Sequence, residues 1–366
     1  MNFENISKAQ TIWIYGYSNL GRNAFNKFKL LYPEKTRGIL VSRHNKKSKK
    51  SEKNVVELKD AKLQNCVIVI ATNPIFHEEI INLLQKEKCE SVYIYDNRMN
   101  NWIDELLNVI PPVETKLLAI SVGQACNYKC KDCLNFAPYA HTENMRYPIE
   151  QIEEDLKNVM PYFVQIDKLH IQGGEPFVYS DLIKLIEFIK ANFDNKVKEI
   201  QIATNGSIIP SQSALKRMAE AGCTVRISNY KNEKNATLLI EKLNDYGIKY
   251  WKYDFAGKKG EWNLGGDIEY VAPKDENLLE KVYQCKWSAC YTLENGIIGR
   301  CARSIPARSL QKISIYDKDY VNVRKRISMK EISEYFMFIK PLACCRHCKG
   351  SNGEPIVAAI QLGEQN

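Results

Sequence analysis

The sequence predicts an α/β protein in three parts: a doubly wound N-terminal sheet, a central partial (β/α) barrel and a small cysteine-rich C-terminal domain. Strand and helix patterns alternate over the first ~110 residues, and strand starts then recur about every 25–31 residues, the length of a βα unit. Nine of the 12 cysteines fall in two later groups. A length of 366 residues suits two or three domains. We place them at residues 1–110, 111–270 and 271–366.

The N-terminal part is predicted as a small Rossmann-like sheet. Four apolar runs, at residues 11–15, 38–41, 66–70 and 91–95, read as strands, and the third is apolar throughout, as in buried parallel strands. Helical patterns cover residues 19–31 and 75–88. Pro111 and Pro112 then break the chain and mark a domain boundary.

The first strand of this part leads into the loop Gly16-Tyr-Ser-Asn-Leu-Gly21, which could present amide groups to a phosphate. The dinucleotide fingerprint G-x-G-x-x-G has glycine where Ser18 stands, and an acidic residue after the second strand, where Ser42 and Arg43 stand. Arg43 could instead meet a phosphate. Two interpretations remain open: a nucleotide or nucleotide-sugar site, and a degenerate docking domain.

The central part carries five βα units that suggest a barrel or partial TIM-type barrel. Ile149, Ile152 and Leu156 give one apolar helical face, and the helix from Leu182 follows a possible Ser180 cap. Two further helices end at glycines, as C′ positions prefer. Ligands are then expected at the carboxyl ends of the strands. The strands begin near Leu117, Lys168, Glu199, Thr224 and Lys249, and the terminal glycines are Gly222 and Gly247.

Charge and composition indicate which partners and which cellular location to expect. The net charge is +9, and much of it lies in the basic run 43–53, which we interpret as a solvated loop. No aromatic stripe for stacking bases accompanies this run, so we expect no nucleic-acid partner. No run of 18 apolar residues and no signal-peptide pattern is present, so we expect no membrane span and a cytoplasmic location. Reduced cysteines in that compartment indicate metal or redox chemistry, with Cys66, Cys89 and Cys223 as small core residues.

The strongest motif is Cys126-Asn-Tyr-Lys-Cys130-Lys-Asp-Cys133, directly after the first barrel strand. Three thiolates at this spacing can hold a [4Fe–4S] cluster and leave one iron open, which binding of an outside molecule requires. The alternative is a structural zinc site with His141 as fourth ligand, although zinc sites favour CxxC pairs.

A second motif, Gly173-Gly174-Glu175-Pro176, follows the next barrel strand. Paired glycines let the backbone approach a ligand closely, and the carboxylate can accept hydrogen bonds from an ammonium group. Gly-Gly also makes ordinary turns, so the motif is weak by itself. Its position one βα unit after the cysteine loop makes it specific.

Together these motifs resemble the radical S-adenosylmethionine (SAM) superfamily over roughly residues 115–255. The resemblance implies that Cys126, Cys130 and Cys133 hold the cluster, and that SAM chelates the open iron and is cleaved to a 5′-deoxyadenosyl radical. Asp132 stands where many members carry an aromatic residue, which weakens an expected contact to adenine. The residues implied to bind SAM are Gly173, Gly174, Glu175, Pro176, Thr204, Asn205 and Ser228, with Glu175 holding its amino group.

The C-terminal cysteines resemble the twitch subdomain, a short relative of the SPASM domain that holds one auxiliary [4Fe–4S] cluster. Four thiolates from two segments can close a cluster fully. Cys290 and Cys344 are spare and could replace a neighbour, and zinc is the alternative metal. The matching ligands are Cys285, Cys301, Cys345 and Cys348.

The expected activity is hydrogen abstraction from a sugar or nucleotide-sugar, giving oxidation or epimerisation, with flavodoxin or ferredoxin as electron donor. The N-terminal domain and the run from Cys126 to Pro138 resemble those of proteins in bacterial cell-surface polysaccharide synthesis. The alternatives are a radical SAM peptide maturase and a non-catalytic metal-stabilised scaffold. No catalytic residue is assigned, and Arg303 and His170 are candidates that are more often structural.

Overall fold

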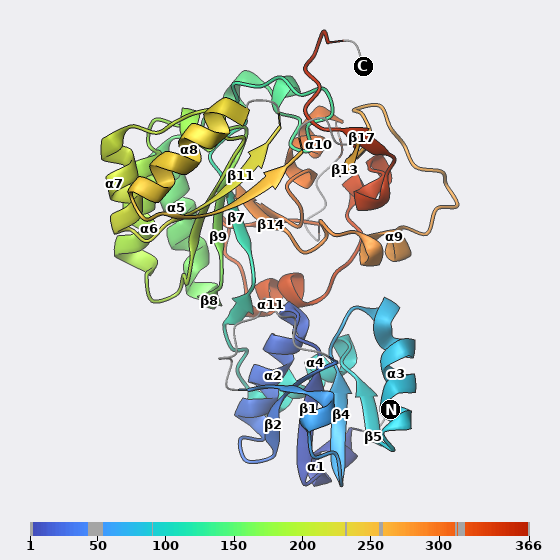
Figure 1. Ribbon diagram of the computed structural model, residues 1–366. Coiled ribbons are helices and arrows are strands. Elements are labelled where there is room, and N and C mark those ends of the chain that lie inside the picture. Colours follow the sequence, from blue (N-terminus) through green and yellow to red (C-terminus); the bar gives the residue numbers. More distant parts are fainter. Residues whose placement is uncertain are drawn as a thin grey trace. The chain divides into compact units, whose positions relative to one another are not determined.

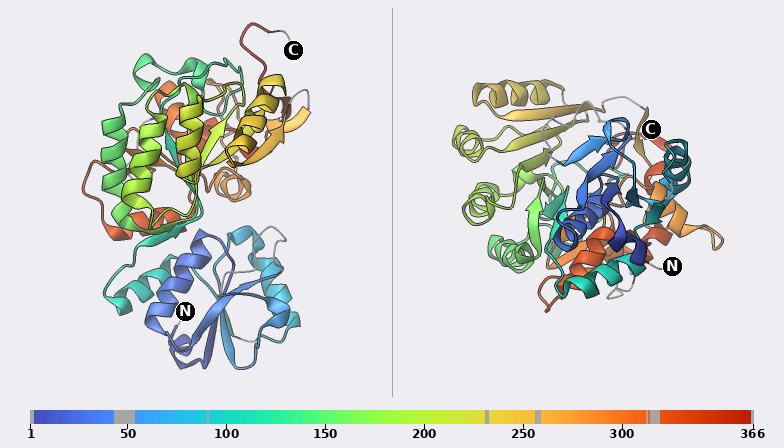
Figure 2. Two further views of the ribbon diagram at one scale, coloured as in Figure 1. Left: turned by 60° about the vertical axis from the view of Figure 1, so that its left-hand side comes forward. Right: turned by 90° about the horizontal axis from the view of Figure 1, so that it is seen from below.

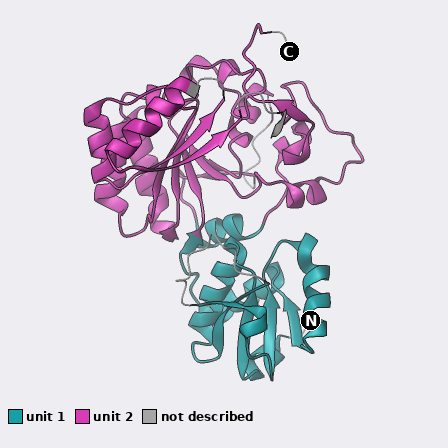
Figure 3. Cartoon of the chain, in the orientation of Figure 1, with its two compact units in different colours: residues 1–114, 328–338 teal, residues 115–327, 339–366 magenta. Residues whose placement is uncertain are grey.

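A computed structural model describes residues 3–42, 54–89, 91–230, 233–255, 259–311, 313 and 319–364. The chain divides into two compact units (Figure 3). Unit 1 comprises Met1–Glu114 and Ser328–Phe338, and unit 2 comprises Thr115–Ile327 and Ile339–Asn366. The expected domain boundaries do not anticipate the return of 328–338 to unit 1. The basic run 43–53, with Arg43, lies outside the described residues.

The sheet of unit 1 is parallel and doubly wound, which confirms the predicted fold class. Its strand order is β3-β2-β1-β4-β5, so the chain moves outward from β1 first in one direction and then in the other. Its strands are β1 (Thr11–Tyr15), β2 (Thr36–Val41), β3 (Val55–Glu57), β4 (Cys66–Ile70) and β5 (Ser91–Ile94).

The sequence analysis did not predict the five-residue α1 or two longer helices of unit 1. In one, α4, Asp96 accepts hydrogen bonds from the Arg98 and Met99 amides and fixes the first turn. The other, α11, is followed by Phe338, whose ring stacks on Tyr95 at 6.2 Å. The elements are α1 (Glu4–Lys8), α2 (Asn19–Leu31), η1 (Leu58–Asp60), η2 (Pro74–Phe76), α3 (His77–Lys86), α4 (Asn97–Leu107) and α11 (Met329–Met337).

The main sheet of unit 2 has the order β12-β11-β10-β9-β7-β14-β15-β16 (Figure 1). The run from β12 to β14 is parallel, as the predicted partial barrel requires, while β15 and β16 continue it antiparallel. Its strands are β7 (Leu118–Ser121), β9 (Leu169–Gln172), β10 (Ile200–Thr204), β11 (Thr224–Asn229), β12 (Lys249–Asp254), β14 (Tyr291–Glu294), β15 (Ile297–Gly299) and β16 (Val321–Asn322). Short strands elsewhere are β6 (Val113–Thr115), β8 (Phe163–Ile166), β13 (Lys259–Asn263) and β17 (Pro355–Val357).

The helices α5, α6, α7 and α8 lie along one face of this sheet (Figure 2). Gly222 and Gly247 take left-handed φ values of 68° and 67° after α7 and α8, as predicted. The predicted Ser180 cap is wrong, because the N-cap of α6 is Asp181. The α-helices are α5 (Ile149–Val159), α6 (Leu182–Phe193), α7 (Gln212–Glu220), α8 (Glu233–Asp245), α9 (Leu278–Gln284) and α10 (Ser304–Leu310). The 3₁₀ turns are η3 (Ala137–Tyr139), η4 (Thr142–Asn144), η5 (Met160–Tyr162), η6 (Pro176–Val178), η7 (Ala343–His347) and η8 (Gly350–Asn352).

The β14–β15 hairpin lies in residues 271–366, which the sequence analysis assigned to the small cysteine-rich domain. Tyr291, Leu293 and Ile298 are buried there. The hairpin turn is Asn295-Gly296, both with positive φ, a standard signal for a two-residue turn. The barrel sheet therefore continues past the boundary expected at residue 270. Among the described residues, no helix combines the length and apolarity needed to cross a membrane.

Candidate functional site

The loop with Cys126, Cys130 and Cys133 begins at the carboxyl end of β7 and is fixed by the backbone before it. The Gly174 amide donates to the Gly123 carbonyl at 2.9 Å, and the Glu175 amide donates to the Ala125 carbonyl at 2.8 Å. On the other side, the amides of Gln124 and Ala125 donate to the carbonyls of residues 144 and 145. The segment 123–125 therefore continues the hydrogen bonding of the sheet beyond the end of β7 and fixes the start of the cysteine loop.

The glycine pair lies where two loops pack closely together. A Cβ on Gly173 would lie 2.2 Å from the Gly123 carbonyl oxygen, and one on Gly174 would lie 2.3 Å from that of Ala125. Such distances are impossible for real side chains. The glycines therefore let two loops pack backbone against backbone, and their expected close approach to a ligand stays a prediction.

Glu175 joins this loop to the one that follows β10. Its carboxylate accepts hydrogen bonds from the amides of Asn205 at 2.7 Å and Phe177 at 3.1 Å, and only 1% of the residue is exposed. Burial raises the pKa of Glu175 to about 7, against the opposing effect of the hydrogen bonds. Pro176 begins η6 directly after it. A carboxylate has about four acceptor positions, so Glu175 retains capacity for a cationic ligand.

The Thr204-Asn205-Gly206 segment reaches the cysteine loop directly. Asn205 Nδ2 donates to Asn127 Oδ1 at 2.9 Å and contacts Cys126 Sγ at 3.9 Å. Thr204 Oγ1 accepts from the Gly206 amide at 3.0 Å and shapes the turn. The structure thus brings together the loops after β7, β9 and β10 at one edge, where parallel strands present their carboxyl ends.

At the end of β11, Ser228 is buried and shares a side-chain hydrogen bond with Tyr230. Its neighbour Asn229 donates to Asp254 at 2.9 Å, while Asn229 Oδ1 is buried and has no hydrogen-bond partner among the described residues. An unpaired buried acceptor costs free energy unless a ligand or water satisfies it. This edge of the sheet therefore offers an acceptor to a polar ligand.

The sulfur atoms of the first group lie among N–H donors. The Tyr128 amide contacts Cys126 Sγ at 3.4 Å, Gln361 Nε2 contacts Cys130 Sγ at 3.3 Å, and Cys133 accepts from backbone amides of the turn that follows it. Burial raises the pKa of the Cys126 thiol to about 12. A buried thiolate ligand needs such donors, and hydrogen bonds to sulfur tune iron–sulfur clusters. The chemistry of these residues fits a cluster.

Within the described part of the chain, no three His, Cys, Asp or Glu side chains converge closely enough to share one metal ion. His141, the fourth ligand of the zinc alternative, lines a different cavity, described below.

The C-terminal cysteines gather around one cavity. Hydrogen bonding from Cys344 lowers the pKa of the Cys345 thiol to about 7, and the Gly350 amide contacts Cys348 Sγ at 3.2 Å. Burial raises the pKa of the Cys301 thiol. The cavity is lined by all four predicted ligands, Cys285, Cys301, Cys345 and Cys348, and by Cys344, whereas Cys290 does not line it.

Arg303 lies between the two cysteine groups. Its guanidinium stacks over Phe136 at 4.1 Å, three residues beyond Cys133, and Nη2 donates to the Gly266 carbonyl at 2.7 Å. The residue is 3% exposed. Burial raises the pKa of both Cys133 and Cys348, and the Arg303 charge opposes this rise at each thiol. Arg303 therefore acts electrostatically on both groups.

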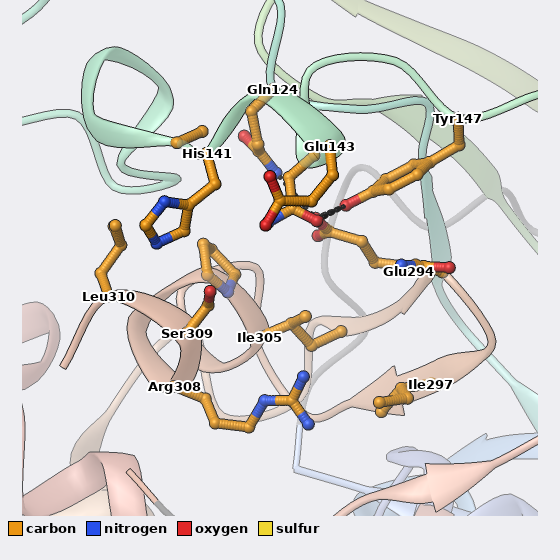
Figure 4. A pocket seen from close by; sticks show the side chains of 14 residues that line it. Gln124, His141, Glu143, Tyr147, Glu294, Ile297, Ile305, Arg308, Ser309 and Leu310 are labelled. Carbon is orange, nitrogen blue, oxygen red and sulfur yellow. Dashed lines mark hydrogen bonds between the residues drawn. The ribbon is translucent and has the colours of Figure 1, made fainter. Parts of the chain in front are cut away.

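A separate cavity opens beside the first cysteine loop (Figure 4). It has a volume of about 210 Å³. Gln124 enters it from the end of β7, Glu294 from the end of β14, and Arg308 from α10. A volume below the ~300–1,000 Å³ of drug-sized ligand pockets suits one small molecule.

The polar groups of this cavity are arranged around Glu294. Its carboxylate accepts from Gln124 Nε2 at 3.0 Å and from the Tyr147 hydroxyl at 2.9 Å, and burial raises its pKa. In the described chain, the buried Gln124 Oε1 and Arg308 Nη1 have no hydrogen-bond partners. The cavity therefore offers one acceptor and one cationic donor to a polar molecule.

His170 is held inside the sheet. Its Nδ1 lies 3.0 Å from Gln201 Oε1, and burial lowers its pKa to about 3. A neutral imidazole paired on the strand stabilises the sheet, and it does not line the cavity described above.

Sequence reasoning missed four residues near the site: Gln124, Glu294, Arg308 and Gln361. Gln124 stands two positions before the first cysteine, and this adjacency was an available signal. Glu294 directly precedes the Asn-Gly turn that identifies β14. Gln361 is 231 residues from Cys130, so no local pattern could connect them.

The central segment of the chain matches a known family. Residues 120–228 match the family model of the radical SAM superfamily, and this segment is a radical SAM domain. The GTP 3′,8-cyclase of Aquifex aeolicus is 30% identical over 138 residues, which are 35% of this chain and 40% of that protein. A probable GTP 3′,8-cyclase of Methanococcus aeolicus is 32% identical over 109 residues, or 30% of this chain and 35% of that protein. The chain thus spans about two fifths or less of these two relatives.

Two solved structures are more distant. The anSMEcpe structure with bound AdoMet and Kp18Cys peptide has 16% identity and a TM-score of 0.42, covering 68% of this chain and 92% of that one. BtrN in complex with AdoMet and 2-DOIA has 13% identity and a TM-score of 0.40, covering 69% and 96%. Proteins of the radical SAM superfamily use a [4Fe–4S] cluster and SAM.

Proposed function

We propose that this protein cleaves SAM reductively and abstracts hydrogen from a small, carbohydrate-like substrate, leading to oxidation or epimerisation. Cys126, Cys130 and Cys133 would hold the cluster, and Glu175 would hold the SAM amino group. When bound, the cluster would supply the electron that splits SAM into methionine and a 5′-deoxyadenosyl radical. The observation that carries the proposal is the joining of the loops after β7, β9 and β10 by Glu175 and Asn205.

The roles of the other residues follow from their positions. The glycine pair Gly173 and Gly174 would align the cysteine loop, and Thr204, Asn205 and Ser228 would line the SAM side of the strand ends. Pro176 would fix the turn after the carboxylate. Cys285, Cys301, Cys345 and Cys348 would hold a second, auxiliary cluster in a twitch-like arrangement.

The cavity around Glu294 supports a small substrate over a peptide. Its ~210 Å³ volume and its paired acceptor and cationic donor suit a monosaccharide-sized molecule with hydroxyl groups. After hydrogen abstraction, loss of a proton and transfer of one electron to the auxiliary cluster would give a ketone. Return of a hydrogen atom from a thiol would give the epimer. A peptide maturase is the alternative function.

The proposal includes a cytoplasmic location and an electron donor such as flavodoxin or ferredoxin. Every cysteine in the described chain is a free thiol, as expected in a reducing compartment. Polysaccharide synthesis is the proposed context, and the cyclase relatives make GTP a compound to be tested beside sugars.

The test is anaerobic reconstitution followed by reduction with dithionite in the presence of SAM. We expect about eight irons per chain and formation of 5′-deoxyadenosine, stimulated by a sugar or nucleotide-sugar. The Cys130→Ala variant should form none, while the matched Cys89→Ala variant in unit 1 should behave as wild type. Absence of 5′-deoxyadenosine would refute the activity, whereas stimulation only by GTP or only by peptides would refute the substrate class.

A further inference from the structure

The segment 360–362 forms a short antiparallel ladder with the first cysteine loop. The Lys131 amide donates to the Ile360 carbonyl at 2.8 Å, and the Leu362 amide donates to the Lys129 carbonyl at 2.8 Å. Between them, Cys130 and Gln361 face each other as a bridge pair. These bonds place Gln361 beside the central cysteine of the motif.

The orientation of the Gln361 side chain is fixed by its partners. Its Oε1 accepts from the Lys129 amide at 2.6 Å, and a backbone N–H can only donate. The amide nitrogen must therefore be Nε2, which donates to the Ala359 carbonyl at 2.7 Å and contacts Cys130 Sγ at 3.3 Å. This sulfur thus receives a hydrogen bond from a side chain whose direction the backbone sets.

We propose that Gln361 tunes the reduction potential of the cluster held by Cys126, Cys130 and Cys133. Reduction adds negative charge to the cluster and its thiolates, so an N–H donor stabilises the reduced state more than the oxidised state. Gln361 therefore raises the potential and makes the cluster easier to reduce. The inference rests on the proposed cluster binding and adds a residue from a distant part of the sequence.

The experiment compares wild type with Gln361→Ala and Gln361→Glu, each reconstituted and titrated by redox potentiometry with EPR detection, without SAM. Alanine removes the donor. Glutamate keeps an oxygen for the Lys129 amide but replaces the donor by a negative charge. We expect the reduced-to-oxidised ratio at a fixed potential to fall about tenfold for alanine, equivalent to ~59 mV for one electron, and further for glutamate.

Two measurements distinguish a direct effect of the Gln361 side chain on the cluster potential from unfolding of the segment 360–362. Hydrogen exchange at the amides of Lys131 and Leu362 should stay slow in Gln361→Ala, because the ladder does not use the side chain. The control Glu364→Ala removes the carboxylate that accepts from the Gln361 backbone amide at 2.9 Å, and it should not lower the potential.

The outcomes are distinct. An unchanged potential in both Gln361 variants would overturn the inference, as would a fall seen only where the two amides lose protection. If wild-type protein binds no cluster at all, the proposed function fails instead. A lower potential with intact protection supports the tuning role.

Discussion

The two cysteine groups are held in different ways. The first group is fixed by backbone hydrogen bonds to residues that directly follow β7 and β9, and by the segment around Gln361. The second group draws its cysteines from loops and from the short turn η7, outside the parallel strands β7 and β9. We infer that the first loop is preformed by the sheet, while the second depends on whatever its thiols bind.

The largest expected effect tests this contrast by removing iron. Anaerobic chelation should greatly increase hydrogen exchange around Cys301 and Cys348, while the amides of Gly174 and Glu175 stay protected, because their partners Gly123 and Ala125 directly follow β7. Exchange mass spectrometry on chelated and reconstituted protein measures both. Equal loss of protection in the two regions would contradict the contrast.

The sheet that supports the first loop should weaken in acid through His170. Its pKa is ordinarily about 6.5 and about 3 in the folded state, so the folded protein resists protonation that the unfolded chain accepts. The contribution of neutral His170 to stability is fully present above about pH 6.5 and is lost as the pH falls toward 3. At ~1.4 kcal/mol per pH unit, this amounts to roughly 4–5 kcal/mol of unfolding free energy.

Denaturant unfolding at a series of pH values measures this effect in wild type and in His170→Gln. Glutamine can still donate to Gln201 and does not titrate in this range. The difference between the two proteins should therefore change with pH between 6.5 and 3 and stay constant above 7. A difference that does not vary with pH would show that His170 is not held neutral by burial.

A smaller effect is expected for the link between loops. The Glu175 carboxylate accepts hydrogen bonds from two backbone amides. In Glu175→Gln, one of these amides would face an NH₂ group and lose its hydrogen bond. An unsatisfied buried donor costs about 1–3 kcal/mol, measurable by chemical denaturation. The matched variant Glu187→Gln removes a partly exposed ion pair to Arg217 and should change stability by less than about 0.5 kcal/mol. Equal changes in stability in the two variants would show that Glu175 does not stabilise the link between the loops.

The smallest effect concerns the residue shared by both groups. Arg303→Gln removes a buried positive charge near Cys133 and Cys348, so both cluster potentials should fall by an amount on the order of 59 mV, or tenfold in the redox ratio. Arg346→Gln is the control, because it removes a cation next to Cys345 in sequence whose hydrogen bond to Pro273 is exposed. A shift in one cluster alone would show that Arg303 serves a single group.

The sequence predicted those parts of the fold that leave a local signal. The apolar run of β4 and the helix Asn19–Leu31 match the prediction, because a buried parallel strand and an amphipathic helix each have a distinctive period. The strand β3 has three residues, too few for any period. The helix α4 carries a helical period at Met99, Trp102, Ile103 and Leu106, and the sequence analysis did not use it.

The candidate site was predicted in its motifs but not in its contacts. The three loops carry recognisable residues, and parallel strands bring their ends together by geometry alone. The packing of Gly173 against Gly123, and the approach of Gln361 to Cys130, are long-range contacts that a motif does not contain. The assignment of ligands and SAM contacts therefore stays a prediction for the experiments above.

The helix α11 has a consequence for how the protein is made. During synthesis, unit 1 emerges from the ribosome first, yet Phe338, which stacks on Tyr95, appears only after almost all of unit 2 has been translated. Until then the hydrophobic core around Phe28 and Tyr95 lacks the Phe338 side chain that packs against it. A truncated chain ending near residue 114 should therefore expose apolar surface and aggregate. Unit 1 is translated first, but it completes its folding only after residue 338 has been translated.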